Sequence, residues 1–312
     1  MSTLAWSGGL VLVTGASGFI GRHVLAMGAR LGVESHSFGR KSPFAGPDSP
    51  TPAKGVFHAG DIEDEVRVRE VIHQAAPAGI IHLAAGGVEY GQRDLPTLLR
   101  ANALGLAHLL EAASTLPRPP AVVCAGSGFE YAPLDRARRE SDPLLPNSAY
   151  GATKAAASAI AAVYAGRMPI TVLRPFSIYG RGESPGRLAP HIIAKARAGE
   201  PVDLTPGEQL RDYAGVTDVA EAFWRALAQP PAIGALRTLN VASGRMITLR
   251  AFVETLAEAL RQAGFKPELR FGARSYRRDE MMNYTADISL LRDTLAWTPA
   301  TPLESGLAHL LT

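Results

Sequence analysis

The 312-residue sequence predicts an α/β fold with a doubly wound parallel sheet and a smaller C-terminal lobe. In the N-terminal half, short β-rich runs alternate with longer helical stretches rich in Ala and Leu, which is the pattern of βα units on a parallel sheet. After Arg174 this alternation gives way to segments rich in Pro and Gly. We therefore expect residues 1–174 to form one domain, to which the chain returns near 213–245, and residues 175–312 to form mainly the smaller lobe.

Short apolar runs in the first half are predicted strands, and the helical stretches between them are long enough to be crossover connections. The predicted strands are Leu10–Thr14, Glu34–Phe38, Val56–His58, Ile80–Leu83, Ala121–Cys124 and Ile170–Leu173. The predicted helices between them are Gly21–Leu31, Asp64–Ala76, Leu95–Leu116 and Tyr150–Gly166. In the second half we expect a short helix near Leu188–Ala198 and a βα pair over Thr238–Ala263.

Composition and charge favour an ordinary globular protein. The hydrophobic content of 46% is enough for a sizeable core. The formal net charge is only +3 and the basic residues are spread along the chain, so we expect no nucleic-acid partner. The single cysteine, Cys124, excludes a disulfide within the chain and fits a reducing compartment. No apolar stretch approaches the roughly 20 residues that span a bilayer, so we expect a cytoplasmic protein with no membrane partner.

A glycine-rich turn follows the first predicted strand. Glycines at 15, 18 and 21 allow a tight turn, close approach of the backbone to a pyrophosphate, and close packing of the next helix on the strand. Strand, turn and helix in this order are typical of a Rossmann-type dinucleotide site. The turn residues that we expect to bind the cofactor are Gly15, Ser17, Gly18, Phe19, Ile20 and Gly21.

The end of the second predicted strand favours one nicotinamide cofactor over the other. Dinucleotide folds usually carry an acidic residue there, which binds the ribose 2′-hydroxyl, but this chain has Phe38-Gly39-Arg40-Lys41. Without a carboxylate to repel a 2′-phosphate, Arg40 could bind one, with Lys41 or Arg22 nearby. We therefore expect NADP(H). NAD(H) remains possible, because the same residues could form a solvated basic loop.

Two further segments follow the third and fourth predicted strands, at the edge of the sheet where the cofactor would lie. Asp61 could accept a hydrogen bond from the adenine amino group, and Ile62 could contact the adenine ring. The stretch Leu83-Ala84-Ala85 offers small residues where a backbone must pass close to the cofactor. Either segment alone would be ordinary core. Their order after the glycine-rich turn assigns both to the cofactor site.

Three side chains predict the chemistry. Tyr150 and Lys154 are spaced i and i+4, on one face of a predicted helix. A free phenol, with a pKa of about 10, exchanges protons poorly at neutral pH, so a nearby cation that favours phenolate makes it useful. Lys154 would also hold the nicotinamide ribose. Ser127 follows the fifth predicted strand, where its hydroxyl could bind the oxygen that exchanges a proton with Tyr150. Together the three predict a site for carbonyl–alcohol redox chemistry.

On these motifs the chain resembles the extended short-chain dehydrogenase/reductase family, which includes nucleotide-sugar epimerases, dehydratases and ketoreductases. The matching stretches are 14–21, 81–85, 102, 127–131, 150–154, 173–180, 211–213, 216–219, 240–244 and 295–299. The resemblance implies a Rossmann domain with a smaller substrate-binding lobe, and a homodimer formed through the helix that carries Tyr150 and Lys154. It also adds Asn102, Pro175 and Ile178 to the expected cofactor site.

The same resemblance implies a nucleotide-sugar substrate and the residues that bind it. Arg211 and Arg277 stand where the family binds the diphosphate, and guanidinium groups suit phosphate chemically. Glu280 stands where a carboxylate often meets the nucleotide ribose, although the run of basic residues around Arg277 makes a register error of one residue easy. The other residues expected to line the substrate site are Ser127, Gly128, Phe129, Ser177, Arg187 and Leu188.

Departures from the family pattern narrow the reaction. The 4,6-dehydratases place an Asp-Glu acid/base pair directly after the catalytic hydroxyl, whereas Gly128 and Phe129 follow Ser127 here. Epimerase-reductases that make fucose nucleotides carry a cysteine where this chain has Phe129. Both elimination of water and epimerisation at sugar carbons three and five are therefore disfavoured.

Two reactions remain that use the same residues. One is reduction of the C4 ketone of an NDP-4-keto-6-deoxyhexose by NADPH, and the other is 4-epimerisation of an NDP-sugar with a retained NAD. Arg40 favours the reductase, because a reductant that must be replaced after each turnover is normally NADPH. The stretch 206–212 also resembles 4-ketoreductases for deoxyhexose nucleotides. Reduction of a carbonyl compound without a nucleotide is a smaller possibility, and a non-catalytic dinucleotide sensor is a remote one.

Overall fold

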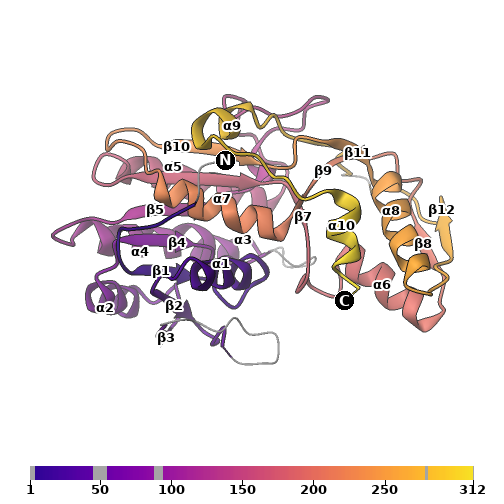
Figure 1. Cartoon of the computed structure of the whole chain (residues 1–312). Coiled ribbons are helices and arrows are strands. Elements are labelled where there is room, and N and C mark those ends of the chain that lie inside the picture. The colour runs from indigo at the N-terminus through magenta and orange to yellow at the C-terminus, as the bar shows by residue number, and fades with distance from the viewer. Residues whose placement is uncertain (1–3, 45–54, 88–93, 278–279, 312) are drawn as a thin grey trace.

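The computed structural model describes residues 4–44, 55–87, 94–277 and 280–311. It contains a seven-stranded parallel sheet in the order β10-β6-β5-β4-β1-β2-β3 (Figure 1). The chain order runs in opposite directions on the two sides of β1, so the sheet is doubly wound, as the alternating pattern predicts. Its strands are β1 (Val11–Thr14), β2 (Ser35–Gly39), β3 (Phe57–Ala59), β4 (Gly79–His82), β5 (Ala121–Ala125), β6 (Ile170–Pro175) and β10 (Arg237–Val241).

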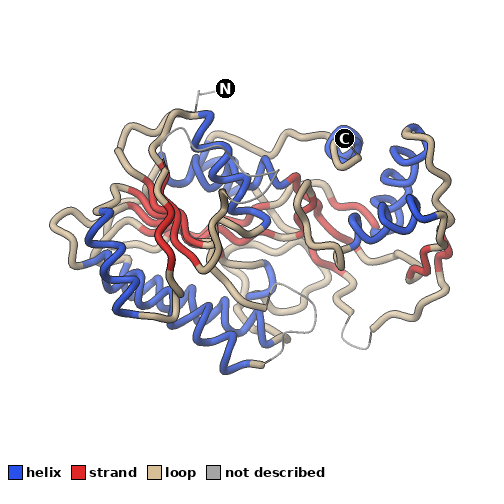
Figure 2. Tube along the Cα trace, turned by 90° about the horizontal axis from the view of Figure 1, so that it is seen from below, coloured by secondary structure: helices blue, strands red, loops and turns tan. Residues whose placement is uncertain are grey.

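Helices cover both faces of this sheet, and Figure 2 shows the strands between the helical layers. One face packs against α1 (Phe19–Arg30) and α7 (Val216–Ala228). The other packs against α2 (Glu65–Ala75), α4 (Gly105–Ser114) and α5 (Ala149–Tyr164). Burial on both faces explains why β1 and β4 are buried at every position, without the alternation of a strand exposed on one side.

The predicted strands and helices of the first half are confirmed, with one correction. The expected helix over 95–116 is divided into α3 (Leu95–Leu99), a π-helical turn (Arg100–Leu104) and α4. A π-turn widens the helix by one residue and is often found at functional sites. Here it carries Asn102, whose side chain makes polar contacts outside the helix.

The smaller lobe is built from short strands and peripheral helices. A four-stranded sheet contains β7 (Ser177–Tyr179), β9 (Leu210–Gly215), β11 (Met246–Thr248) and β13 (Asn283–Tyr284). A two-stranded sheet pairs β8 (Val202–Leu204) with β12 (Leu269–Phe271). The helices are α6 (Leu188–Ala198), α8 (Leu249–Gln262) and α10 (Leu303–Ala308), while α9 (Ser289–Leu295) contributes to the core of the large sheet.

The chain crosses between the two parts more than once. The expected βα pair over 238–263 is not a single unit, because β10 joins the large sheet beside β6, whereas α8 packs in the core of the smaller lobe. The strand β11, which the sequence did not predict, lies between them and pairs with β9. These crossings place β7, β9 and β13 of the lobe next to the carboxyl edge of the large sheet.

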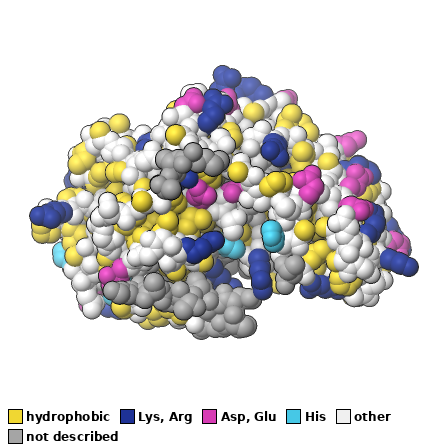
Figure 3. All heavy atoms as spheres, viewed as in Figure 1, with side chains coloured by type: hydrophobic (Ala, Val, Ile, Leu, Met, Phe, Trp, Pro, Cys, Tyr) yellow, Lys and Arg dark blue, Asp and Glu magenta, His cyan; other side chains and the backbone are white. Residues whose placement is uncertain are grey.

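The surface shown in Figure 3 carries Lys and Arg side chains interspersed with Asp and Glu. This distribution agrees with the scattered charge of the sequence. No helix in the described part of the chain is both long enough and apolar enough to cross a membrane.

Candidate active site

The glycine-rich turn after β1 has the close packing that a dinucleotide turn requires. Gly15 has a φ of +66°, and a Cβ atom there would lie 2.5 Å from the backbone nitrogen of Ala84. A Cβ at Gly21 would lie 2.3 Å from the carbonyl oxygen of Gly15. Gly18 is the N-cap of α1, and no side chain caps the first turn of that helix. Its free N–H groups can therefore bind an anion, so the turn fits the pyrophosphate of a dinucleotide.

Thr14 joins this turn to the segment after β4. Its hydroxyl accepts hydrogen bonds from the backbone N–H groups of Leu83 and Ala84, over 3.3 and 3.2 Å. The same hydroxyl lies 2.8 Å from Nδ1 of His82. Burial and the positive charge of Lys154 lower the pKa of His82 to about 3, so its neutral ring can accept the hydroxyl proton. The predicted cofactor stretch 83–85 is thereby held against the glycine-rich turn.

Asn102 connects the cofactor segment to the helix of the predicted catalytic residues. Its Oδ1 accepts a hydrogen bond from the Gly86 N–H over 2.7 Å, and its Nδ2 donates to the Gly86 carbonyl over 3.2 Å. Nδ2 also donates to Oγ1 of Thr153 on α5 over 2.9 Å. Asn102 is 2% exposed, so these contacts satisfy a buried amide. Its expected contact with the cofactor stays a prediction.

The structure brings Ser127 and Tyr150 together. Ser127 follows β5 and begins a 3₁₀ turn (Gly128–Glu130), while Tyr150 lies in the first turn of α5. Burial and the charge of Glu130 raise the pKa of Tyr150 to about 12, against the opposing effects of the Ser127 hydroxyl and Arg187. The net shift is upward because burying a phenolate costs more free energy than these neighbours recover. Tyr150 is therefore a protonated phenol at neutral pH.

Lys154 lies one helical turn beyond Tyr150 on α5 and is 3% exposed. Burial lowers the pKa of its ammonium group, whereas the negative charge of Glu130 raises it. The same carboxylate therefore acts on both Tyr150 and Lys154.

Glu130 is a buried acid that the sequence reasoning missed. Its side chain is fully buried, and its Oε1 accepts a hydrogen bond from the backbone N–H of Ser127 over 2.8 Å. Its Oε2 accepts from the Ser158 hydroxyl over 2.7 Å and from Nε of Arg174 over 2.9 Å. Both carboxylate oxygens of Glu130 are thus bonded within the protein, and the Oε1 contact holds the backbone of Ser127.

Arg174, at the end of β6, is the cation paired with Glu130. It is 4% exposed, and its Nη1 donates to the Tyr131 hydroxyl over 2.8 Å. That hydroxyl donates in turn to Oδ1 of Asn240 over 2.7 Å. The matching motifs at 127–131, 173–180 and 240–244 therefore meet in one buried network beneath the catalytic hydroxyl.

An aromatic stack lies beside Ser127 and includes a second residue that sequence reasoning missed. Tyr284 of β13 stacks on Phe129 with ring centres 4.6 Å apart and on Phe176 at 4.8 Å. Phe129 also meets Tyr150 edge-on at 6.3 Å. The side chain of Tyr284 is buried, which raises the pKa of its phenol, whereas a hydrogen bond with the Ser127 hydroxyl lowers it. The sequence did not predict Tyr284 at the site, because it is far along the chain from Ser127 and belongs to none of the recognised motifs.

The residues expected around the adenosine differ in their exposure and in their contacts. Nη1 of Arg40 lies 3.9 Å from Oδ2 of Asp61, and the two side chains are 79% and 41% exposed. Nε of Arg22 donates to the carbonyl of Ser17 in the glycine-rich turn over 3.0 Å. Ile62 is 8% exposed and belongs to the apolar core that includes α2 and α4. The expected contacts of Arg40, Asp61 and Ile62 with a cofactor therefore stay predictions.

The residues expected at the diphosphate and nucleotide include an ion pair. Nη2 of Arg211 lies 2.8 Å from Oε1 of Glu280, and Nη1 donates to the Met281 carbonyl over 2.7 Å. Arg277 is exposed, and its carbonyl accepts from the Glu280 N–H over 3.1 Å. The structure thus brings Arg211 and Glu280 together as an ion pair.

The loop from β7 to α6 contributes another acid–base pair. Nε of Arg187 lies 3.4 Å from Oε1 of Glu183, and α6 begins directly afterwards at Leu188. Burial raises the pKa of Glu183 to about 7. The charges of Arg211, Glu183, Arg187 and Glu280 all act on the hydroxyl of Tyr213, so both pairs lie around it. The remaining expected residues, Pro175, Ser177 and Ile178, lie at the end of β6 and in β7.

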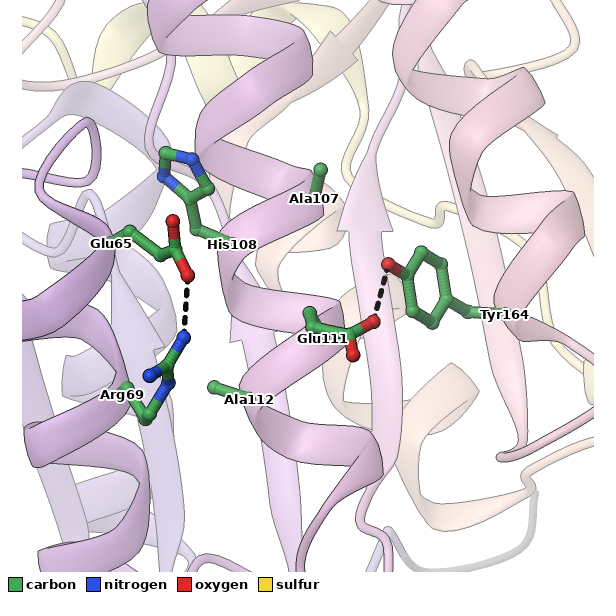
Figure 4. Close-up of a pocket in the computed structure, with 7 residues that line it drawn as sticks. All are labelled: Glu65, Arg69, Ala107, His108, Glu111, Ala112 and Tyr164. Atoms are coloured by element: carbon green, nitrogen blue, oxygen red, sulfur yellow. Dashed lines mark hydrogen bonds and ion pairs between the residues drawn. The ribbon is translucent and has the colours of Figure 1, made fainter.

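A separate pocket lies on the outer helical layer, between α2, α4 and α5 (Figure 4). Arg69 pairs with Glu65 on one side of it, and the Tyr164 hydroxyl donates to Glu111 over 2.8 Å on the other. None of the predicted site residues lines this pocket, so it is distinct from the candidate active site.

Comparison with known proteins agrees with the motifs. Residues 11–242 match the model of the NAD dependent epimerase/dehydratase family. The chain is 33% identical to a dTDP-6-deoxy-L-talose 4-dehydrogenase (NAD(P)(+)) of Kitasatospora kifunensis, over 97% of this chain and 94% of the relative. It is 28% identical to UDP-glucuronate 4-epimerase 1 of Arabidopsis thaliana, over 96% and 76%. The structure of MoeE5 in complex with UDP-glucuronic acid and NAD is similar, with a TM-score of 0.83, 30% identity, and coverage of 96% and 97%.

The family match covers well over half of the chain, including the glycine-rich turn, Ser127, Tyr150 and Lys154. The similarity to the Kitasatospora relative extends over nearly the whole length of both chains. The fold agrees as well, because the parallel sheet has the strand order of a dinucleotide-binding domain. The chain is therefore an enzyme of the NAD dependent epimerase/dehydratase family, as its motifs predict.

Proposed function

We propose that this enzyme reduces the C4 ketone of an NDP-4-keto-6-deoxyhexose with NADPH. The observation that carries the proposal is the 33% identity, over nearly both full lengths, to a dehydrogenase whose name places its chemistry at C4 of a 6-deoxyhexose nucleotide. The site is consistent with it. Ser127 and Tyr150 meet at the carboxyl edge of the sheet, and no acidic side chain follows Ser127 toward the cleft, since Glu130 is bound to Arg174.

The residues of the site suit delivery of a proton to a carbonyl oxygen. The glycine-rich turn at Gly15, Gly18 and Gly21 would hold NADPH, which would supply the hydride for the ketone carbon. The Ser127 hydroxyl holds the carbonyl oxygen, and Tyr150, protonated at neutral pH, donates its proton to the alkoxide that forms. Lys154 is buried one helical turn beyond Tyr150, where an ammonium group would favour the phenolate left after that transfer.

The second candidate is a 4-epimerase of an NDP-sugar that retains NAD. It is favoured by the similarity to a UDP-glucuronate 4-epimerase and to MoeE5 bound to NAD. The Arg40–Asp61 contact also keeps the second-strand edge from being purely basic. Ser127, Tyr150 and Lys154 would also serve this reaction. The proton would first be removed from the C4 hydroxyl and later returned to the C4 oxygen.

One assay separates the two reactions. The protein is mixed with NADPH or NADH and an NDP-4-keto-6-deoxyhexose, and cofactor absorbance is followed together with product analysis. A reductase consumes one NADPH for each alcohol formed, and Tyr150→Phe abolishes the consumption. Interconversion of NDP-sugars without added cofactor, or NAD bound to the purified protein, would replace the reductase with the epimerase.

We also infer that the enzyme is a cytoplasmic homodimer that pairs through α5. Val163 on α5 is 72% exposed, and Leu104 of the neighbouring π-turn is 50% exposed, so this helical face presents apolar side chains to solvent. Sedimentation at several concentrations, with Val163→Glu as the disrupting variant, measures the association. A wild-type monomer at all concentrations contradicts it.

A further inference from the structure

Arg138 is a buried cation whose donors are left without partners. It lies between the 3₁₀ turn and α5, and its side chain is 0% exposed. Its Nε and Nη1 have no hydrogen-bond partner among the residues that the structure describes, and Nη2 reaches only the Met281 sulfur, at 3.3 Å. No ion pair to Arg138 occurs within these ranges. Burial of an unpaired charge is costly, so a charged partner is missing.

The backbone of Arg138 is firmly held, so the free donors do not result from a loose loop. Its N–H donates to the Thr285 carbonyl over 3.0 Å. Its carbonyl accepts from the Asp287 N–H over 2.8 Å and from Nδ2 of Asn240 over 3.0 Å. Asn240 belongs to the network that supports Ser127. The position of the guanidinium is therefore fixed relative to the candidate active site.

The guanidinium lies behind the aromatic stack that borders the catalytic residues. Its Cζ is 5.8 Å from the ring centre of Tyr284. The Tyr284 hydroxyl lies at the catalytic turn, because the Ser127 hydroxyl forms a hydrogen bond with it and a Cβ on Gly128 would lie only 2.7 Å from it. Tyr284 therefore connects the Ser127 hydroxyl to Arg138, whose Nε and Nη1 are left without partners among the described residues.

The charges around Arg138 point to an anionic ligand. Burial lowers the pKa of Arg138, Tyr284 raises it, and Arg211 lowers it, so a second cation lies within electrostatic reach. Arg136 acts in the same direction, whereas Asp142 acts in the opposite direction but is bound to Arg136 at 2.6 Å. A guanidinium stays charged in proteins, so the positive charge here is uncompensated.

We propose that Arg138 binds an anionic oxygen group of the substrate, either its diphosphate or a carboxylate on its sugar. This inference rests on the proposed nucleotide-sugar substrate. Two N–H donors on one planar group match a phosphate or carboxylate, and Tyr284 can donate its hydroxyl to the same ligand. Arg138 is then a substrate-binding residue additional to Arg211, and opening of the Tyr284 stack admits the ligand.

The test measures ligand affinity in the cofactor-loaded protein by calorimetry. UDP, dTDP, UDP-glucose, UDP-glucuronic acid and inorganic pyrophosphate are titrated into wild type, Arg138→Gln and Arg138→Met. The matched control is Arg139→Gln, which removes the same charge from the next residue, where the side chain is 68% exposed and bound to Asp287. We expect Arg138→Gln to raise the Kd at least about tenfold while Arg139→Gln leaves it unchanged.

Each pattern of results decides a separate point. An equal loss for all the diphosphates supports Arg138 binding the diphosphate, and a loss confined to UDP-glucuronic acid supports a sugar carboxylate. Unchanged affinities in a folded Arg138→Gln or Arg138→Met overturn the inference. If wild type binds no nucleotide, the proposed function fails, and a loss of pyrophosphate binding in Arg138→Gln but not in Arg139→Gln still supports an anion site at Arg138.

Discussion

Two buried arginines on either side of the catalytic turn face opposite situations. Arg174 is 4% exposed and is bound by the Glu130 carboxylate and the Tyr131 hydroxyl. Arg138 is 0% exposed, and its guanidinium reaches only a thioether sulfur within the described chain. The charge of Arg174 is neutralised by the Glu130 carboxylate. The charge of Arg138 has no carboxylate partner among the described residues, which is why we propose that a ligand supplies one.

The contrast separates support from recognition. A buried ion pair with complete hydrogen bonds holds its neighbours in one arrangement, and Glu130 thereby fixes the backbone of Ser127. An unpaired buried cation stabilises nothing in the free protein, so its retention calls for a ligand that completes it. Substitution of Arg174 should therefore lower the free energy of unfolding of the ligand-free protein, whereas substitution of Arg138 should raise it.

The largest effect is expected at Arg174. Arg174→Met leaves the Glu130 carboxylate buried without its cation, so the free energy of unfolding should fall by about 3–5 kcal/mol. Urea denaturation measures it. The double variant with Glu130→Gln removes both charges and should recover a large part of the loss. Equal loss in the single and double variants would mean that the ion pair does not carry the stability.

Glu183 is an intermediate case, with one oxygen bound by Arg187 and the other buried without a partner. Its pKa is raised from 4.5 to about 7, so folding favours the neutral acid. The stabilising effect is complete below pH 4.5 and is lost as the pH rises through about 7. Glu183→Gln stays neutral, so it should exceed wild type in stability by up to about 3 kcal/mol above that pH.

Thermal unfolding across the pH range measures this difference. The control is Glu200→Gln. In wild type the Glu200 carboxylate is exposed just after α6 and is bound to Lys195. If the difference in stability between Glu183→Gln and wild type is the same at acid and neutral pH, the pKa of Glu183 is not raised by folding.

Arg138 should respond in the direction opposite to Arg174. Arg138→Met fills a similar volume without a buried charge, so the ligand-free protein should gain about 1–2 kcal/mol of stability. The gain should shrink or reverse when a nucleotide sugar is present, because only wild type gains the extra binding free energy. Denaturation with and without UDP-glucose measures both effects. A loss of stability in the ligand-free state would make Arg138 a structural residue like Arg174.

Much of the large sheet could be predicted from the sequence because its strands and helices are signalled by short stretches of neighbouring residues. Apolar runs such as that before Gly15 give strands, and the spacing of Tyr150 and Lys154 places them on one helical face. The π-turn at Asn102 could not be read in this way. The Asn102 side chain in this turn is bonded to Gly86, which lies 16 residues away along the chain, outside the local pattern that predicts a helix.

The polar interior of the site was missed for the same reason. Glu130 lies within the matching stretch 127–131 but was given no role, because only the fold brings Arg174 and Ser158 to its carboxylate. Arg138 gives no sequence signal either, because exposed and buried arginines look alike in a polar loop. The raised pKa of Tyr150 could not be read from the sequence either, because the spacing of Tyr150 and Lys154 does not show the depth of burial.

The smallest effect on stability is expected at the exposed Arg40–Asp61 pair, which completes the series of arginines. The two side chains are 79% and 41% exposed and 3.9 Å apart, so solvent screens their attraction. Arg40→Gln should change the free energy of unfolding by less than about 0.5 kcal/mol.

Its effect on cofactor choice should be larger than its effect on folding. If Arg40 binds the 2′-phosphate, Arg40→Gln weakens NADPH binding about tenfold and leaves NADH binding unchanged, because only NADPH carries that phosphate. Fluorescence titration of both cofactors measures the ratio, with Lys41→Gln as the neighbouring charge control. An equal change for NADPH and NADH would mean that Arg40 acts only through long-range charge. The preference for NADP(H), and with it the argument from Arg40 for the reductase, would then lose its structural basis.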